Sequence, residues 1–404
     1  MSVTTLQLTA RDPIVARDGR PFGAGQGNRM RSLSWPLPSV VAGSFRTALV
    51  KANQALTFDG DMPQRLMKIE VAGVFPTVGQ ELYLPAPSDC VWDEMTGKIH
   101  RVRPIPLEQG DGVDFLLDDL EPVRLTKEQA EDDFKPKTIP AWWPLQKYLE
   151  WLTADTIEYV PEWFDNKFLS NAKVETRDHV SLDADTGAAA DGQIFATAGL
   201  NVTHLPKFGV NVGDKNLPFN KRFAEITLSV RVTIAEKAFA HVENLNTWHP
   251  LGGERRLVHW QANGHSAAWR CPPEISAKLA AVEKDDGIRM VLATPAIFDH
   301  GWRPNWLDAI TLTGKPTGYG PTLKLVGVSN ARWKAVSGWS LAKLKDQPRG
   351  PKPIRRMVLA GSVYFFKKVE GDGNILATNG WLNPVSDSLQ DRNDGFGLAV
   401  WGTW

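Results

Sequence analysis

The chain has 404 residues, and its 46 basic and 46 acidic residues leave no net charge at neutral pH. With 42% hydrophobic and 23% charged residues it has the composition of a soluble globular protein, which excludes a disordered or fibrous chain, and it is long enough for two domains. No apolar run has membrane-spanning length, and the N-terminus lacks the pattern of a secretory signal. The two cysteines lie outside any C-x-x-C arrangement, which favours a reducing cytoplasm. Since no run is long enough to span a bilayer, no membrane association is expected.

The charge is distributed in zones along the chain. Residues 11–51 contain seven basic and two acidic residues, and residues 331–356 contain eight basic and one acidic residue. Residues 89–134 carry the compensating excess, thirteen acidic against five basic. One charged run taken alone is as well explained by a solvated face, but two Gly/Pro-rich basic zones favour an anionic ligand.

The first elements are a strand, a basic loop and a helix. Leu6 and Leu8 alternate with polar residues and predict the strand. The loop RDGRPFGAGQGNRMRSLSWPLPS (17–39) holds four glycines and four arginines. Ser39 is expected to be the N-cap of a helix through VVAGSFRTALVKAN (40–53), because a serine hydroxyl accepts a hydrogen bond from the first turn.

Further elements follow the same α+β pattern. Residues 68–87 predict a hairpin, and AWWPLQKYLEWL (141–152) predicts a helix whose first turn Pro144 limits or kinks. FAEITLSVRVTI (223–234) alternates cleanly and predicts a half-buried strand that closes the first module. The elements predicted for a second module are strands near 256–260, 288–293, 322–329 and 357–367 and a helix over 274–286.

The glycine-rich loop resembles no nucleotide-binding fingerprint. A dinucleotide site requires G-x-G-x-x-G directly at a helix start. Here eleven residues, two of them prolines, lie between Gly27 and the predicted N-cap of the helix. Its arginines suit the phosphates and bases of a nucleic-acid strand. The alternative is a flexible surface loop whose arginines pair with the acidic zone of the same chain.

Two more segments are candidate sites. ETRDHVSLDADTGAAADGQIF (175–195) predicts a long hairpin in which His179 could be a general base, although its neighbours do not suggest a second histidine, a serine or a cysteine as its catalytic partner. The spacing of the other histidines does not indicate a metal site. The end of the chain, QDRNDGFGLAVWGTW (390–404), has a glycine loop that suits either an RNA base or a structural turn.

Several segments together resemble subunit three of the Cmr effector complex, the type III-B CRISPR interference machine, within the RAMP superfamily of RNA-binding proteins. PSVVAGSFR (38–46) resembles the start of the first helix in RAMP proteins, and GFGLAVWG (395–402) resembles their C-terminal glycine loop. The other matching segments are 12–25, 32–49, 175–195, PLGGERR (250–256), 292–304 and 355–366.

The resemblance implies a non-catalytic subunit with two ferredoxin-like, RRM-related domains, expected at 1–237 and 238–404. It implies binding of the 5′ repeat-derived tag of CRISPR RNA, and contacts with the large polymerase-cyclase-like subunit and with the backbone subunits, so that target RNA is met indirectly. No cofactor or metal is expected. The RNP aromatic motif of ordinary RRM proteins is absent, so loops rather than the sheet face are expected to hold RNA.

The residues expected to contact RNA lie within these segments. The first group is Arg17, Arg20, Arg29, Arg31 and Arg46. The second group is Asn28, Ser39, Arg177, His179, Arg255, Arg256, Arg355, Arg356, Gly395, Phe396 and Gly397. Two alternatives remain open: a RAMP-type endoribonuclease that processes CRISPR repeat RNA, and a protein scaffold whose sixteen tryptophans serve cores and interfaces.

Overall fold

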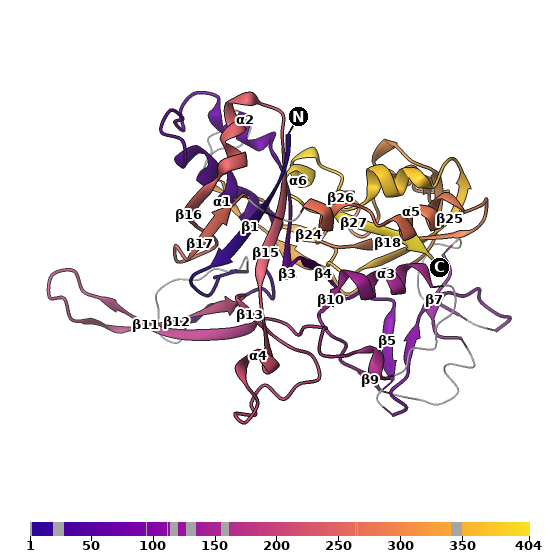
Figure 1. Cartoon of the computed structure of the whole chain (residues 1–404), viewed down its shortest axis with the longest axis horizontal. Coiled ribbons are helices and arrows are strands. Elements are labelled where there is room, and N and C mark those ends of the chain that lie inside the picture. The colour runs from indigo at the N-terminus through magenta and orange to yellow at the C-terminus, as the bar shows by residue number, and fades with distance from the viewer. Residues whose placement is uncertain are drawn as a thin grey trace. The chain divides into compact units, whose positions relative to one another are not determined.

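The computed structural model describes residues 2–18, 28–93, 95–110, 112–113, 120–126, 135–154, 161–262, 264, 266–340 and 350–404 (Figure 1). It forms two compact units, each assembled from three stretches of chain. Unit 1 consists of Met1–Gly79, Ser170–His265 and Ala335–Arg355, and unit 2 of Gln80–Leu169, Ser266–Lys334 and Arg356–Trp404. The domain boundary expected between residues 237 and 238 stays a prediction.

Five antiparallel strands of unit 1 lie side by side in the order β3-β15-β1-β17-β16. Their bounds are β1 (Ser2–Ala10), β3 (Glu70–Val78), β15 (Thr227–Ile234), β16 (Asn246–Pro250) and β17 (Leu257–Gln261). Alternate side chains of β1 and β15, such as Leu8 and Val230, are fully buried. This confirms the predicted alternation, in which one face of each strand enters the core.

The helices of unit 1 are α1 (Pro38–Lys51), α2 (Met62–Met67), α4 (Phe219–Arg222) and the 3₁₀ segment η3 (Lys237–Asn244). Helix α1 packs on the sheet through Phe45, whose ring lies 5.5 Å from that of Trp260. The prediction that Ser39 is the N-cap is wrong, because the N-cap is Leu37 and the helix begins at Pro38. A proline suits the first turn, where its missing N–H has no intrahelical partner to lose.

A second sheet of unit 1 contains the long hairpin β11 (Lys173–Leu182) and β12 (Ala189–Asn201), with β2 (Asn28–Arg29) parallel to β12. The hairpin extends far beyond the rest of unit 1 (Figure 1). Its presence confirms the hairpin predicted around residues 175–195. Short strands complete the unit: β13 (His204–Pro206) pairs with β14 (Phe223–Glu225), and β22 (Trp339–Ser340) with β23 (Gly350–Pro351).

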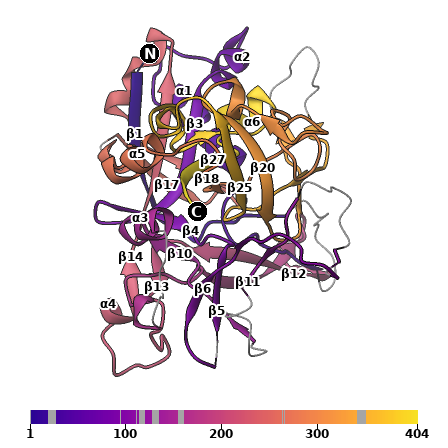
Figure 2. The same cartoon turned by 90° about the vertical axis from the view of Figure 1, so that its right-hand side faces the viewer.

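Unit 2 contains a six-stranded antiparallel sheet in the order β19-β20-β25-β18-β27-β26, part of which is seen in Figure 2. Its strands are β18 (Gly287–Leu292), β19 (Thr313–Gly314), β20 (Thr322–Ser329), β25 (Val363–Glu370), β26 (Asn383–Pro384) and β27 (Leu398–Thr403). The accompanying helical segments are η4 (Ser266–Trp269), α5 (Pro273–Ala280), η5 (Pro316–Gly318), η6 (Leu376–Gly380) and α6 (Leu389–Asn393). Strands β21 (Lys334–Val336) and β24 (Arg355–Met357) lie where the chain passes between units.

The four central strands of each unit have the same spatial order. In unit 1 the order across the sheet is β3-β15-β1-β17, and in unit 2 it is β20-β25-β18-β27. When the four strands of each unit are numbered along the chain, both orders read 2-3-1-4. The predicted α+β class is confirmed, because both units contain helices together with antiparallel sheets.

The segment Gln80–Leu169 supplies the remaining elements of unit 2. They are β4 (Glu81–Pro85), β5 (Cys90–Asp93), β6 (Ile99–Arg101), β7 (Arg103–Pro104), β8 (Val123–Arg124), β9 (Pro136–Lys137), β10 (Trp142–Pro144), α3 (Leu145–Thr153) and η2 (Pro161–Trp163). The helix predicted from residue 141 begins only at Leu145, because Pro144 forces the residue before it to stay extended. The fully buried Trp143 contacts the rings of Trp151 and Phe168 at the core of this segment.

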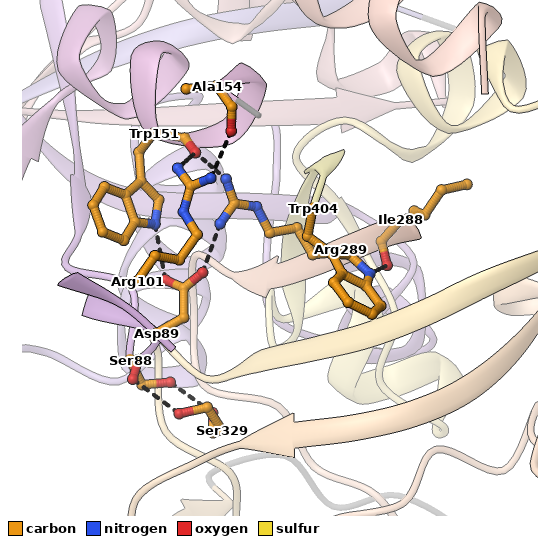
Figure 3. A network of polar contacts seen from close by, with 9 residues as sticks. All are labelled: Ser88, Asp89, Arg101, Trp151, Ala154, Ile288, Arg289, Ser329 and Trp404. Carbon is orange, nitrogen blue, oxygen red and sulfur yellow. Dashed lines mark hydrogen bonds and ion pairs between the residues drawn. The ribbon is translucent and has the colours of Figure 1, made fainter. Parts of the chain in front are cut away.

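A buried polar network joins this segment to the sheet of unit 2 (Figure 3). Asp89 accepts hydrogen bonds from Arg289 Nη1 at 2.6 Å and from Trp151 Nε1 at 2.8 Å. Arg289 and Arg101 both donate to the backbone carbonyl of Trp151. The charges are thus paired and hydrogen-bonded, as charges inside a protein must be.

Among the helices of the described residues, none is both long and apolar enough to cross a membrane.

Candidate nucleic-acid interface

Both ends of the basic loop are held in place in unit 1. The backbone of Ile14 exchanges two hydrogen bonds with Leu200 of β12, at 2.9 and 2.8 Å. On the other side, Asp18 N–H donates to the carbonyl of Arg31 at 3.2 Å, and Leu33 N–H donates to that of Ala16 at 2.7 Å. The residues before and after the loop therefore pair with each other next to the base of the long hairpin.

A third segment, the turn between β16 and β17, packs against the same place. Gly253 N–H donates to Val15 O at 2.9 Å. Gly252 has a φ of +78°, and a Cβ built there would lie 2.4 Å from Val15 O. Glycine is required at this position both by the left-handed backbone and by the close approach of the segment around Val15.

These three segments enclose a pocket of about 220 Å³. Most of its lining is apolar, and Arg17 is the charged residue on its wall. The lining residues are Ile14, Val15, Ala16, Arg17, Leu33, Pro36, Leu37, Val40, Gly252 and Gly253. The arrangement offers an apolar recess next to a guanidinium group, which suits a flat ring that carries a phosphate.

Of the arginines expected from the sequence, Arg17 lines this pocket, and others lie on the segments that form it. Arg17, Arg29 and Arg31 are exposed. Arg255 is also exposed, in the turn that carries Gly252 and Gly253, while Arg256 is half-buried. Arg20 lies outside the described residues, and of Asn28 only the backbone, paired with Phe195 of β12, is described.

The hairpin places the two predicted residues Arg177 and His179 on one face of β11. Arg177 is exposed and forms an ion pair with Glu175, with Nε 2.6 Å from Oε1. The ring of His179 stacks on that of Phe195 at 5.1 Å and 15°, and its Nε2 lies 2.8 Å from Thr197 Oγ1. The hairpin therefore presents the Arg177 guanidinium next to the stacked rings of His179 and Phe195, the His179–Phe195 step.

Arg46 and Ser39 have different environments from the exposed arginines. Arg46 is 8% exposed, and its Nη2 donates to the carbonyl of Ile69 at 2.7 Å. It ties α1 to the start of β3, which is a structural role. Ser39 is half-buried in the first turn of α1.

The glycine loop near the C-terminus is enclosed within unit 2. Phe396 is 1% exposed. Gly397 has a φ of +81°, and a Cβ there would lie 2.6 Å from Ser386 Oγ. The carbonyl of Gly395 accepts from Thr294 Oγ1 at 2.8 Å. These contacts make the loop a packed turn within unit 2, and its contact with RNA stays a prediction.

Arg355 and Arg356 are exposed on β24. The guanidinium of Arg356 lies 4.8 Å from the ring centroid of Trp333, within unit 2. Arg355 belongs to unit 1 and Arg356 to unit 2. The two arginines are therefore neighbours in the sequence but belong to different units.

Sequence reasoning missed the apolar and aromatic parts of this site. Val15, Phe195 and Thr197 are held next to the predicted cations only through strand pairing over long sequence distances. A signal was present in the sequence, since Gly252 lies in PLGGERR (250–256) and Phe195 in the hairpin motif (175–195), two segments that the resemblance singled out. Across the described parts of the chain, no three His, Cys, Asp or Glu side chains gather in the manner of a metal site.

No curated protein matches the chain. Among solved structures, it is similar to a chain of the type III-B Cmr-beta bound to cognate target RNA, at 15% identity and a TM-score of 0.46. It is also similar to a chain of the type III-B Cmr-beta bound to cognate target RNA and AMPPnP, at 15% identity and a TM-score of 0.47. Each match covers 89% of this chain and 86% of the other. A chain of the Csm3-Csm4 subcomplex of the type III-A CRISPR-Cas interference complex matches at 12% identity and a TM-score of 0.29, covering 91% of this chain and 94% of the other.

The family comparison covers almost the whole chain. The family model for CRISPR-associated protein (Cas_Cmr3) matches residues 6–404. The resemblance seen in the sequence is thereby confirmed, and the chain belongs to the Cas_Cmr3 family of CRISPR-associated proteins.

Proposed function

We propose that this protein is a non-catalytic RNA-binding subunit of the type III-B Cmr complex that recognises the 5′ repeat-derived tag of CRISPR RNA. In this role it joins the tag to the large polymerase-cyclase-like subunit and to the backbone subunits, and meets target RNA only indirectly. It acts in the cytoplasm. Membership of the Cas_Cmr3 family supports the assignment to the complex.

One observation carries the RNA-binding proposal. The exposed residues Arg17, Arg31 and Arg255 lie on the three segments that enclose the apolar pocket of about 220 Å³. Single-stranded RNA is held by cations on its phosphates and by recesses or rings that accept its unstacked bases. The pocket supplies a place for a base, and the arginines supply bidentate donors for the adjoining phosphates.

The strand order supports ferredoxin-like domains. In that fold the second and fourth of four antiparallel strands lie at the two edges, with a helix after the first strand and another after the third. The order β3-β15-β1-β17 fits this scheme, with α1 after β1 and η3 after β15. In unit 2 the order β20-β25-β18-β27 also fits, although an irregular segment stands between β18 and β20.

The experiment compares guide RNA that carries the 5′ tag with the same RNA carrying a scrambled tag, over a range of salt concentrations. We expect the wild type to prefer the tagged RNA. The variant Arg29→Ala/Arg31→Ala should bind it more weakly, with a salt slope reduced by ~1.4, since each phosphate contact to a single strand contributes ~0.7.

The matched control is Arg270→Ala/Lys284→Ala, which removes two exposed cations from unit 2. It should leave both the affinity for tagged RNA and the salt slope unchanged. If the Arg29/Arg31 variant retains the wild-type affinity and salt slope, the proposed interface is wrong and the scaffold alternative is favoured.

A further inference from the structure

Unit 1 has a second, larger groove, away from the pocket described above. It is open and holds about 580 Å³. Two stretches of its lining, around Ser170 and Pro206, are joined by a hydrogen bond from Ser170 N–H to Pro206 O at 2.9 Å. The groove is lined by Ser170, Asn171, Lys173, Pro206, Lys207, Phe208, Gly209, Val210, Asn211 and Val212.

The cations of the groove are held in fixed positions. Lys207 Nζ donates to the carbonyl of Asn220 at 2.9 Å. Lys173 Nζ lies 5.2 Å from the ring centroid of Phe223. An ammonium has three N–H donors, so a single carbonyl or an aromatic face leaves donors available for an anion.

The surrounding segment is basic. Residues 204–225 contain Lys207, Lys215, Lys221 and Arg222 against the two acids Asp214 and Glu225, and Lys173 adds a further positive charge. Arg222 Nη1 donates to the carbonyl of Val212 at 2.9 Å, which fixes the wall of the groove. Neutral donors and acceptors are present too, because Asn211 uses its Oδ1 for Gly213 N–H and keeps its amide N–H groups.

The groove continues the face of the hairpin that carries Arg177 and His179. Lys173 is the first residue of β11, and residues two apart on a strand point to the same side. Lys173, Arg177 and His179 therefore share one face, over roughly 20 Å at about 3.4 Å per residue. Glu175 lies on the same face and is paired with Arg177. Their register with Asn201, Thr197 and Phe195 is continuous across this stretch.

We propose that this groove is a second phosphate-binding site, which holds the single-stranded RNA that leaves the hairpin face at Lys173. The inference rests on the proposed RNA-binding function. In this proposal Lys173 and Lys207 bind phosphate oxygens, and Phe208, a half-buried residue of the groove lining, contacts a base. Continuity with the hairpin face favours RNA over an acidic segment of a partner protein as the occupant.

The test measures the salt dependence of binding to a tagged guide RNA and to its 5′ tag alone. The variant Lys173→Gln/Lys207→Gln should bind the longer RNA with a slope reduced by ~1.4, equal to two phosphate contacts, and several-fold more weakly at physiological salt. The control Lys215→Gln/Lys221→Gln has the same charge change at exposed positions outside the groove lining, and should remain close to the wild type. Thermal unfolding of each variant checks that the fold is retained.

A photoreactive residue in place of Phe208 gives a second readout, which does not depend on the lysine variants folding. It should crosslink to the guide RNA. If the groove variant binds with an unchanged slope and no crosslink to RNA forms, or if that variant instead loses a partner subunit while RNA binding is normal, the groove inference is wrong. If the wild type itself shows no preference for tagged RNA, the proposed function fails first, so the two failures are distinguished.

Discussion

Asp89 and Arg289 are 200 positions apart in the chain and form an ion pair at 2.6 Å in which neither side chain is exposed. The carboxylate follows β4, and the guanidinium lies on β18, a central strand of the unit 2 sheet. Trp151 of α3 binds both partners, through its indole N–H and its carbonyl oxygen. The pair therefore fastens the Gln80–Leu169 segment to the sheet of unit 2.

Asp89→Ala should destabilise unit 2 by about 3–5 kcal/mol, because it leaves a buried guanidinium without its counter-charge. The exposed ion pair of the hairpin gives the control: Glu175→Ala removes the partner of Arg177 and should cost less than about 1 kcal/mol. Urea unfolding of the two variants measures both values. Equal losses of stability in the two variants would contradict the structural role of the buried pair.

Gly252→Ala should distort the pocket and weaken RNA binding. The new Cβ would lie 2.4 Å from Val15 O, at a φ of +78° that alanine rarely adopts. Gly43→Ala is the matched control, since a Cβ in α1 at that position meets nothing within 4 Å and alanine favours the helix. Binding of tagged RNA is the measurement, and equal affinities in the two variants would show that the turn does not shape the RNA site.

Phe195→Leu should lower the affinity for tagged RNA by about 1–3 kcal/mol if a base stacks on the His179–Phe195 step. His179→Ala should weaken binding in the same way, and neither variant should alter RNA cleavage, because the wild type is expected not to cleave. Incubation with CRISPR repeat RNA checks this. Site-specific, metal-independent cleavage that disappears in His179→Ala would establish the endoribonuclease alternative.

His249 should make the stability of unit 1 depend on pH. Its burial, and then the charge of Lys51, lower the pKa of this histidine from 6.5 to about 4. The unfolded chain therefore binds a proton below pH 6.5 that the folded chain takes up only near pH 4, and stability is lost as the pH falls through this window. Between pH 8 and pH 5 the loss amounts to about 2 kcal/mol.

Comparison with His249→Gln isolates this contribution from the other groups that titrate over the same range. Urea unfolding of both proteins at pH 8 and pH 5 should show that the free energy of unfolding decreases more in the wild type than in the variant. The same decrease in both would mean that His249 titrates alike in the folded and unfolded chains.

The sequence predicted the elements whose signals are local. The alternation over 223–234 led to β15, the apolar run near 322–329 corresponds to β20, and the hairpin around 175–195 is present. The helix after the basic loop was predicted to within two residues at its start, although the cap was assigned to the wrong residue. Helix α3 was predicted too early, because Trp142 is at helical spacing from Leu145 and Leu149 although Pro144 keeps the residue before it out of the helix.

Long-range pairing decided what the sequence could not predict. That Gln80–Leu169 shares a unit with the C-terminal sheet depends on contacts such as Asp89–Arg289, which no periodicity reveals. In the candidate site, the exposed arginines followed from charge and motif. The burial of Arg46 and of Phe396 did not, because a basic or glycine-rich motif has the same sequence signal whether it binds a ligand or the backbone of its own fold.

The most direct test of the central claim is to purify the protein from its native cells and to sequence the RNA that accompanies it. The account predicts short RNAs that share a common, repeat-derived 5′ end, and predicts that the Arg29→Ala/Arg31→Ala variant recovers fewer of them. RNA with no shared 5′ end, or no RNA at all, would contradict recognition of the guide-RNA tag.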